Sequence, residues 1–355
     1  MGCFGGFFYR ATRADLKDIL HFNMESSDKR VLPSHVTTPT AAGIGPGLGG
    51  TPSDQSRTIM WCVPRTISSA VTKCFSAIDG IEVWFEPYFY CLATETVSAS
   101  DLNLTIPKEY EGNENLFQQA ADYLRGLWRC NALKPQHLSY ASIKSFLEHS
   151  TGKHVFVKDM GTGMKSCNFE FLPKGYKHTF LIRHPLRVFT SLRKATYTTF
   201  GEMGMLRGES SEEKTFDVGR DYIFMDPSQL AFGELYELWK YVRENLDSDP
   251  IVIDADDLLS NPAELLPKYC EAIGLPYDES LLKWDASMAL TEKWNVAGED
   301  LLGSIKDFYG RALTTGIFAP PGPMPSRDHV TPDVIRCTDT VMKYYDELYQ
   351  SRLKV

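Results

Sequence analysis

The sequence lacks several patterns that would assign it to a common class. It has no basic excess, because 37 Lys and Arg residues stand against 46 Asp and Glu, for a formal net charge of −9. General nucleic-acid binders usually carry such an excess, so no nucleic-acid partner is expected. The chain also has no apolar run of about 18 residues, the length that a membrane-spanning helix needs. No membrane span is therefore expected.

Cysteine pairs with metal-binding spacing are absent too. None of the eight cysteines forms a Cys-x-x-Cys pair, and several, such as Cys62 and Cys74, lie in apolar stretches. The first residues contain too short an apolar stretch for a signal peptide. We therefore expect reduced, mostly buried thiols, a cytoplasmic protein and no bound metal. Acylation at Gly2 or Cys3 stays open, although Gly6 stands where the myristoylation pattern has Ser or Thr.

Composition divides the chain into two parts. Residues 1–56 are rich in Pro, Gly, Ser and Thr and show no helical or strand period, which is typical of a disordered, low-complexity tail. Residues 57–355 are expected to form one α/β domain. Within it, residues 318–332 form a Pro-rich loop and residues 332–352 a final helix.

The domain alternates apolar runs with amphipathic stretches. Residues 58–63 form a continuous apolar run, as in a strand covered on both faces, and residues 67–78 show a helical period. Alternation of this kind predicts a parallel sheet between layers of helices. The expected fold is a three-layer α/β sheet of about five strands, similar to that of P-loop nucleoside triphosphate hydrolases. The expected strands are residues 58–63, 81–87, 153–160, 178–185 and 250–259.

The turn after the first strand is rich in groups that bind anions. Arg65 supplies a positive charge, and Thr66, Ser68 and Ser69 supply hydroxyl groups. In parallel sheets, ligands bind at the carboxyl ends of the strands, where a helix N-terminus attracts anions. The turn therefore predicts a phosphate or sulfate site. It lacks the glycines and the lysine of a triphosphate-binding P-loop.

A second anion site is expected at the end of the fourth strand. Arg183 stands at the carboxyl end of that strand, and Ser191 follows two helical turns later. Because both strands belong to one sheet, the two sites are expected to face each other.

These two segments together resemble the sulfotransferases that use phosphoadenosine phosphosulfate (PAPS). Pro64-Arg65-Thr66-x-Ser68-Ser69 resembles the loop that holds the phosphosulfate in that family, and "RHPLRVFTS" resembles its second motif. The segment "VIDADDLLSNP" with the helix after it resembles a third. The resemblance spans about residues 58–285. It implies a PAPS-binding α/β fold and transfer of a sulfuryl group. It also implies that Arg65, Thr66, Ser68 and Ser69 hold the phosphosulfate, while Arg183 and Ser191 hold the ribose-linked phosphate.

Two positions depart from the family pattern. Ile67 stands where many members have glycine, a feature shared with a divergent group that includes chains labelled aminotransferase-like. Met160 stands where cytosolic sulfotransferases have a catalytic histidine, although Lys158 keeps the preceding lysine position.

With that histidine absent, a carboxylate is the expected base. Glu86 ends the second strand, and other members of the family use a glutamate near this place. We therefore expect Glu86 as base, with Lys158 and Arg65 stabilising the leaving charge. Asp159 is the second candidate. The alternative is that Glu86 only forms a salt bridge with Arg65.

The acceptor is expected to be a small molecule with a hydroxyl or amine group. Loops at residues 88–115 and 197–230 are expected to form its pocket, the second as a lid. By the resemblance, residues 293–311 are expected to fold over the nucleotide. Two other readings stay open, namely a kinase or nucleotide hydrolase that uses ATP and magnesium, and a non-catalytic nucleotide-binding module.

Overall fold

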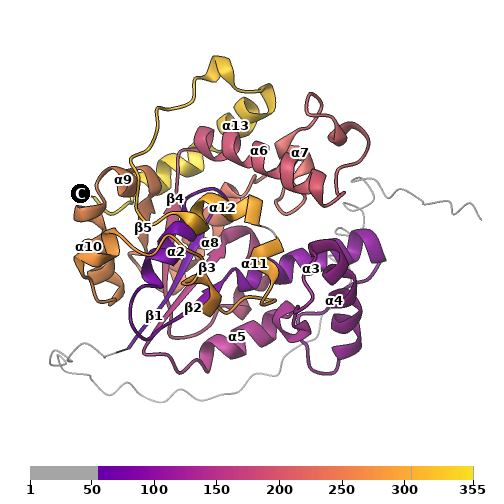
Figure 1. The fold of residues 1–355 in the computed structure, drawn as a ribbon, viewed down its shortest axis with the longest axis horizontal. Coiled ribbons are helices and arrows are strands. Elements are labelled where there is room, and N and C mark those ends of the chain that lie inside the picture. Colours follow the sequence, from indigo (N-terminus) through magenta and orange to yellow (C-terminus); the bar gives the residue numbers. More distant parts are fainter. Residues whose placement is uncertain (1–54, 305, 355) are drawn as a thin grey trace, which may run out of the picture. The chain divides into compact units, whose positions relative to one another are not determined.

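A computed structural model describes residues 55–304 and 306–354 of the protein. Their strands form one parallel sheet in the order β2-β3-β1-β4-β5 (Figure 1). The strands are β1 (Ser56–Cys62), β2 (Ile81–Phe85), β3 (His154–Met160), β4 (Lys177–Ile182) and β5 (Ile251–Asp254). The sheet confirms the expected parallel α/β fold, with β1 at its centre between β3 and β4.

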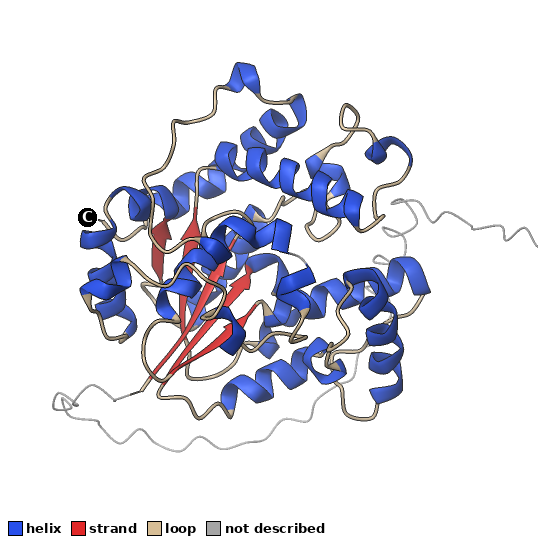
Figure 2. Ribbon diagram, viewed as in Figure 1, coloured by secondary structure: helices blue, strands red, loops and turns tan. Residues whose placement is uncertain are grey.

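Helices connect the strands and surround the sheet (Figure 2). The α-helices are α2 (Ser68–Phe75), α3 (Pro87–Leu102), α4 (Glu114–Trp128), α5 (Tyr140–Glu148), α6 (Pro185–Glu202), α7 (Val218–Asp221), α8 (Phe232–Asn245), α9 (Ala255–Ser260), α10 (Pro262–Ile273), α11 (Leu301–Ser304), α12 (Lys306–Thr314) and α13 (Pro332–Gln350). Short 3-10 helices are η1 (Pro135–Leu138), η2 (Gly161–Gly163), η3 (Ser166–Phe171), η4 (Gly208–Ser211), η5 (Glu279–Leu282), η6 (Thr291–Lys293) and η7 (Arg327–His329).

The two faces of the sheet are covered by different helices. Side chains in a strand alternate between the two faces, so Phe156 and Asp159 of β3 point in opposite directions. The ring of Phe156 lies 4.9 Å from that of Phe75 in α2. The carboxylate of Asp159 accepts a hydrogen bond from the amide of Tyr88 in α3. The sheet is therefore the middle layer of three, with α2 on one face and α3 on the other.

Helix α3 lies in a region that the sequence analysis treated as a loop. Its first eight residues, Pro87 to Thr94, are all buried, so they show none of the apolar and polar alternation that marks a surface helix. Helix α6 continues to Glu202, so the start of the expected lid, residues 197–230, is helical.

The expected fifth strand, residues 250–259, is wrong in its second half. The side chain of Asp254 accepts hydrogen bonds from the amides of Asp256 and Asp257, which ends β5 and starts α9. A carboxylate in this capping position is a common way to begin a helix.

The boundary of the expected tail lies close to the start of β1, which begins at Ser56. Residues 1–54, including the possible acylation sites, lie outside the described residues. The seven described cysteines are all free, and only Cys167 is exposed. Among the described residues, no helix combines the length and the apolar character needed to cross a membrane.

Candidate active site

The turn between β1 and α2 forms one wall of the site. Arg65 and Ile67 have positive φ angles of 68° and 60°, so the backbone turns sharply before α2 begins. No side chain caps this helix at Ile67, and the amides of Ser68 and Ser69 precede the first hydrogen bond of the helix, which Ala70 donates to the carbonyl oxygen of Ile67. The side chains of Ser68 and Ser69 border the cleft in front of these amides. This end of α2 is therefore open to an anion.

The second expected anion site lies directly beside the first. The Nε group of Arg65 donates to Ser191 Oγ in α6 at 2.9 Å. Arg183, which follows β4, reaches the carbonyl oxygen of Arg65 with Nη1 at 3.5 Å. Burial and the nearby charge of Arg183 lower the pKa of Arg65. The structure thus brings together the two segments that the sequence analysis expected to face each other.

Asp256 of α9 orients the arginines of the second segment. One of its carboxylate oxygens lies 3.0 Å from Nε of Arg183, and the other lies 2.9 Å from Nε of Arg187. Arg187 also donates to the carbonyl oxygens of Gly322 and Pro323 in the Pro-rich loop. Sequence reasoning missed this role of Asp256, because only the pairing of β5 with β4 brings the start of α9 beside the end of β4.

A cleft of about 350 Å³ opens between these groups, a size suited to a small ligand. Most of its polar side chains come from β3, from the turns after β1, β2 and β4, and from α2 and α6. Its apolar wall comes from the segment between Ile317 and Gly322. The expected residues that border it are Arg65, Ser68, Ser69, Glu86, Lys158, Arg183 and Ser191.

Thr66, which was expected to hold the phosphosulfate, does not border this cleft. It is fully buried, and its hydroxyl donates to the carbonyl oxygen of Val63 at 2.9 Å. The side chain of Thr66 therefore braces the turn.

The inner end of the cleft holds a buried ion pair. The ammonium group of Lys158 contacts Oε1 of Glu86, and these side chains are 3% and 0% exposed. The hydroxyl of Tyr309 donates to Oε2 of the same carboxylate at 2.5 Å. Burial lowers the pKa of Lys158, but the neighbouring Glu86 outweighs it and gives a raised pKa. The alternative of a Glu86–Arg65 salt bridge is wrong, because Lys158 is the partner.

Asp159, the second candidate base, has a different position. Its carboxylate accepts hydrogen bonds from the amides of Tyr88, Phe89 and Met160 at 2.6 to 3.1 Å. Burial raises its pKa to about 8, although these amides favour the charged form. Asp159 therefore holds the start of α3 on the face of the sheet opposite Lys158.

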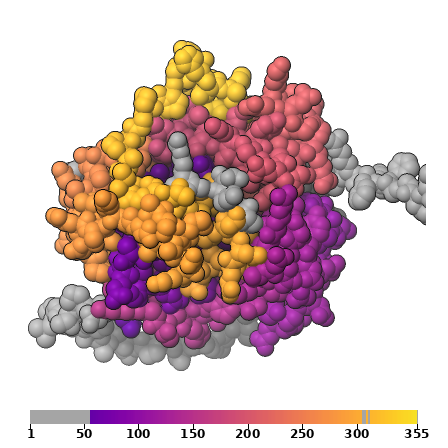
Figure 3. Space-filling view, viewed as in Figure 1, coloured from indigo at the N-terminus to yellow at the C-terminus, as the bar shows by residue number. Residues whose placement is uncertain are grey.

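Helix α12 covers the inner end of the cleft. Arg65 stacks over the ring of Phe308 at 5.3 Å and also donates to the carbonyl oxygen of that residue. Lys73 of α2 is buried and donates to the carbonyl oxygens of Leu313 and Thr315, at the end of α12. Figure 3 shows this part of the chain, in orange, at the centre of the face toward the viewer. Residues 293–311 were expected to cover the nucleotide, and Phe308 and Tyr309 do border the cleft.

A second, apolar cavity of about 60 Å³ adjoins the cleft and shares Met160, Phe308 and Tyr309 with it. Both segments that were expected to shape an acceptor pocket contribute to its wall. Its other lining residues are Phe89, Tyr90, Ala93, Trp128, Thr199, Phe200, Met203, Met205, Tyr222, Phe224 and Leu301.

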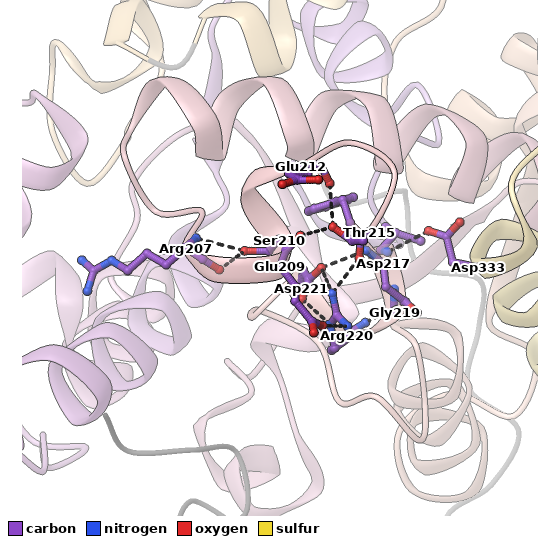
Figure 4. Close-up of polar contacts among 12 residues, drawn as sticks. Arg207, Glu209, Ser210, Glu212, Thr215, Asp217, Gly219, Arg220, Asp221 and Asp333 are labelled. Carbon is purple, nitrogen blue, oxygen red and sulfur yellow. Dashed lines mark hydrogen bonds and ion pairs between the residues drawn. The ribbon is translucent and has the colours of Figure 1, made fainter. Parts of the chain in front are cut away.

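Figure 4 shows polar contacts within residues 207–221, part of the expected lid, and between this segment and Asp333 of α13. Asp217 caps α7 through the amides of Gly219 and Arg220. It also forms an ion pair with Arg336 of α13. Asp333 of α13 accepts from the amide of Val218 at 2.9 Å. This part of the expected lid is thus fixed to α13 by several bonds.

No group of three or more His, Cys, Asp or Glu side chains in the described part of the chain could hold a metal ion. His178 and His184, the histidines nearest the second segment, are not among the residues that border the cleft. His178 accepts a hydrogen bond from Trp61, and burial lowers its pKa to about 4.

Comparisons with known proteins bear on the C-terminal half and on the chain as a whole. Residues 228–349 match the family described as "Sulfotransferase domain". The chain is 25% identical over 227 residues to "Branched-chain-amino-acid aminotransferase-like protein 2" of Arabidopsis thaliana, which is 64% of this chain and 31% of that protein. It is 31% identical over 114 residues to "Sulfotransferase ppzF" of Metarhizium majus, which is 30% of each.

Among solved structures, the "Sulfotransferase Domain from the Curacin Biosynthetic Pathway" is 14% identical to this chain, with a TM-score of 0.37. The alignment covers 81% of this chain and 98% of that one. The chain spans about a third of the length of the first curated relatives that it matches. Residues 228–349 are therefore similar to a sulfotransferase domain.

Proposed function

We propose that this protein transfers the sulfuryl group of PAPS to a hydroxyl or amine group of a small-molecule acceptor. One observation carries the proposal. Two arginines, the open end of α2 and Ser191 surround a single cleft, and a buried Lys158–Glu86 pair lies at its inner end. Transfer of a group from one oxygen to another requires a site for the anionic donor, a base for the acceptor proton and a cation for the charge that develops. The cleft contains all three.

The proposed roles divide the cleft between two anionic groups. Arg65, Ser68 and Ser69 hold the phosphosulfate at the start of α2, together with the backbone amide of Thr66. Arg183 and Ser191 hold the ribose-linked phosphate. The uncapped start of α2 supports this fit, because its free amides suit an oxyanion. The turn has no P-loop lysine for a magnesium-bound triphosphate.

The proposed chemistry uses the ion pair at the inner end of the cleft. PAPS supplies an activated sulfuryl group. Glu86 takes the proton of the acceptor while the acceptor oxygen forms a bond to sulfur. The bond between sulfur and the bridging phosphate oxygen breaks in line with it, and Lys158 and Arg65 stabilise the charge left on that oxygen. Each of these side chains borders the cleft.

The apolar cavity next to Glu86 is the proposed acceptor site. Its walls are aromatic and methionine side chains, and it meets the cleft at Met160 and Tyr309. Such a surface favours an acceptor with an apolar or aromatic body, such as a phenol.

The first test concerns the donor. Thermal unfolding is followed in the presence of PAP, the desulfated nucleotide, or of ATP with magnesium. At about 100 times its dissociation constant, a ligand stabilises the folded state by about 2.7 kcal/mol. We expect PAP to stabilise the wild type but not Arg183→Ala. Arg327→Ala is the control, because Arg327 pairs with the exposed Asp339 away from the cleft. Stabilisation by ATP with magnesium alone would support the kinase or hydrolase reading instead.

The second test concerns the base. Glu86→Gln keeps the shape of the side chain and removes its capacity to accept a proton, and should lower transfer to a phenol about a hundredfold or more. PAP binding should persist in this variant. Transfer at the wild-type rate would exclude Glu86 as the base. Binding of PAP by a wild type that releases no PAP from PAPS with any acceptor would identify a non-catalytic nucleotide-binding module.

A further inference from the structure

The carboxylate of Glu86 has no free oxygen in this structure. Lys158 contacts Oε1, and the hydroxyl of Tyr309 donates to Oε2. A general base must lie within hydrogen-bond distance of the proton that it removes. Lys158 cannot leave the pair without stranding a buried charge. An acceptor hydroxyl that approaches Glu86 Oε2 must therefore share that oxygen with the Tyr309 hydroxyl or displace it.

Tyr309 stands at the junction of the two cavities. It borders the anion cleft and the apolar cavity, and its own side chain is buried. Its ring packs edge-on against Phe85 at 5.4 Å and against Phe308 at 5.2 Å. Tyr309, Met160 and Phe308 border both cavities, so this ring lies where the apolar cavity meets the cleft that Glu86 borders.

We propose that Tyr309 competes with the acceptor for Glu86, and that it keeps water from the base while no acceptor is bound. The inference rests on the proposed function and adds a specificity-determining residue to it. When water takes the place of the acceptor, its oxygen bonds to sulfur and its proton goes to Glu86. The bond from sulfur to the phosphate oxygen breaks, and the products are PAP and sulfate. The Tyr309–Glu86 hydrogen bond suppresses this loss of donor.

The charge state of Tyr309 agrees with this role. Burial and the adjacent Glu86 raise the pKa of its hydroxyl well above its ordinary value, so it remains a hydrogen-bond donor. The charged groups that face it are Glu86 between β2 and α3, Lys158 on β3 and Arg65 on the turn after β1. Rotation about the Cα–Cβ bond of Tyr309 would move the hydroxyl away from the carboxylate.

The test measures the release of PAP from PAPS without any acceptor. Tyr309→Phe removes one oxygen and keeps the ring. Loss of one hydrogen bond to a charged group typically changes an equilibrium constant or a rate about tenfold. We therefore expect the rate of PAP release to rise about tenfold. The Glu86→Gln, Tyr309→Phe double variant should show the low rate of Glu86→Gln alone. Tyr345→Phe is the matched control, because Tyr345 is also buried and donates to a buried carboxylate, that of Asp254, outside both cavities.

A ring-fluorinated tyrosine introduced at position 309 tests the effect of a stronger hydrogen bond to Glu86. It is a stronger hydrogen-bond donor of nearly the same shape, so donor loss should fall below the wild-type rate. This variant also keeps the test decisive if Tyr309→Phe is unstable, because the hydroxyl and the packing are preserved.

The other outcomes overturn the inference. Slower or unchanged PAP release in a Tyr309→Phe protein that still binds PAP would show that Tyr309 orients the base or only packs. A gain of one sulfuryl group on Tyr309 of the wild type would make it an acceptor and not a competitor. If the wild type fails to bind PAP, the proposed function falls and this inference falls with it. If it binds PAP and only the Tyr309 results disagree, the inference alone is wrong.

Discussion

The Nε group of Arg65 lies 2.9 Å from Ser191 Oγ, although 126 positions separate these residues in the sequence. This bond joins the turn after the central strand β1 to the helix that follows its neighbour β4. Both strands end at the same edge of the sheet because they are parallel. The contact makes one continuous site from two segments that each resemble only half of a nucleotide-binding site.

Loss of the Ser191 hydroxyl should weaken nucleotide binding. Ser191→Ala removes a group proposed to hold a phosphate and frees the Arg65 Nε group. We expect the dissociation constant for PAP to rise about tenfold, which corresponds to about 1.4 kcal/mol. Isothermal titration measures it. Thr190→Ala is the control, because that hydroxyl donates to the carbonyl oxygen of Leu186 within α6. Equal effects of the two variants would argue against a binding role for Ser191.

The orientation of Arg183 by Asp256 should also matter for binding. Asp256→Asn retains only one acceptor oxygen and leaves Arg183 and Arg187 without a charged partner. We expect weaker PAP binding, by about tenfold, with little loss of stability because these side chains are partly exposed. Asp257→Asn, which breaks the pair with Arg352, should bind PAP like the wild type. Unchanged affinity in Asp256→Asn would mean that Arg183 needs no orientation.

At Ile67 the left-handed backbone should make a glycine variant more stable than an alanine variant, which is the reverse of their usual order in a helix. A residue with a Cβ atom is strained at a φ angle of 60°, whereas glycine is not. We therefore expect Ile67→Gly to be more stable than Ile67→Ala by about 1 kcal/mol. Urea unfolding measures the difference. In the interior of α2, Val71→Gly should instead be less stable than Val71→Ala by about 1 kcal/mol. If alanine were the more stable variant at both Ile67 and Val71, the left-handed geometry at Ile67 would be contradicted.

Glu234 should make stability depend on pH. Burial raises the pKa of this carboxyl from 4.5 to about 7. Between these values the folded protein holds a proton that the unfolded chain has lost, so stability falls as pH rises. The fall should total about 3 kcal/mol, and this contribution should be constant below about pH 4.5 and above about pH 7.

The comparison with Glu234→Gln isolates this contribution, because the amide does not titrate. The free energy of unfolding of the wild type minus that of the variant should fall through this pH range. Glu237→Gln removes an exposed carboxylate of the same helix and should leave the slope unchanged. Parallel curves for wild type and Glu234→Gln would refute the raised pKa.

The sequence by itself determined the parallel α/β architecture and pointed to the segments that we propose bind anions. Continuous apolar runs marked the strands, because strands covered on both faces have no polar side. Arg65 and Arg183 were singled out because each is a polar group just after a buried strand, and Ser191 because it follows Arg183 by two helical turns. Helix α3 was missed for the opposite reason, since its first turns are buried on every side and carry no amphipathic period.

Only the tertiary structure decided which polar groups meet. Glu86 and Asp159 both follow buried runs, and no local pattern separates them. The alternation of side chains along β3 places Lys158 on the cleft face, where it pairs with Glu86, and turns Asp159 to the amides of α3. Tyr309 and Asp256 complete the site from segments far away in the chain. Such contacts depend on how helices pack against the sheet, and spacing along the sequence carries no record of that packing.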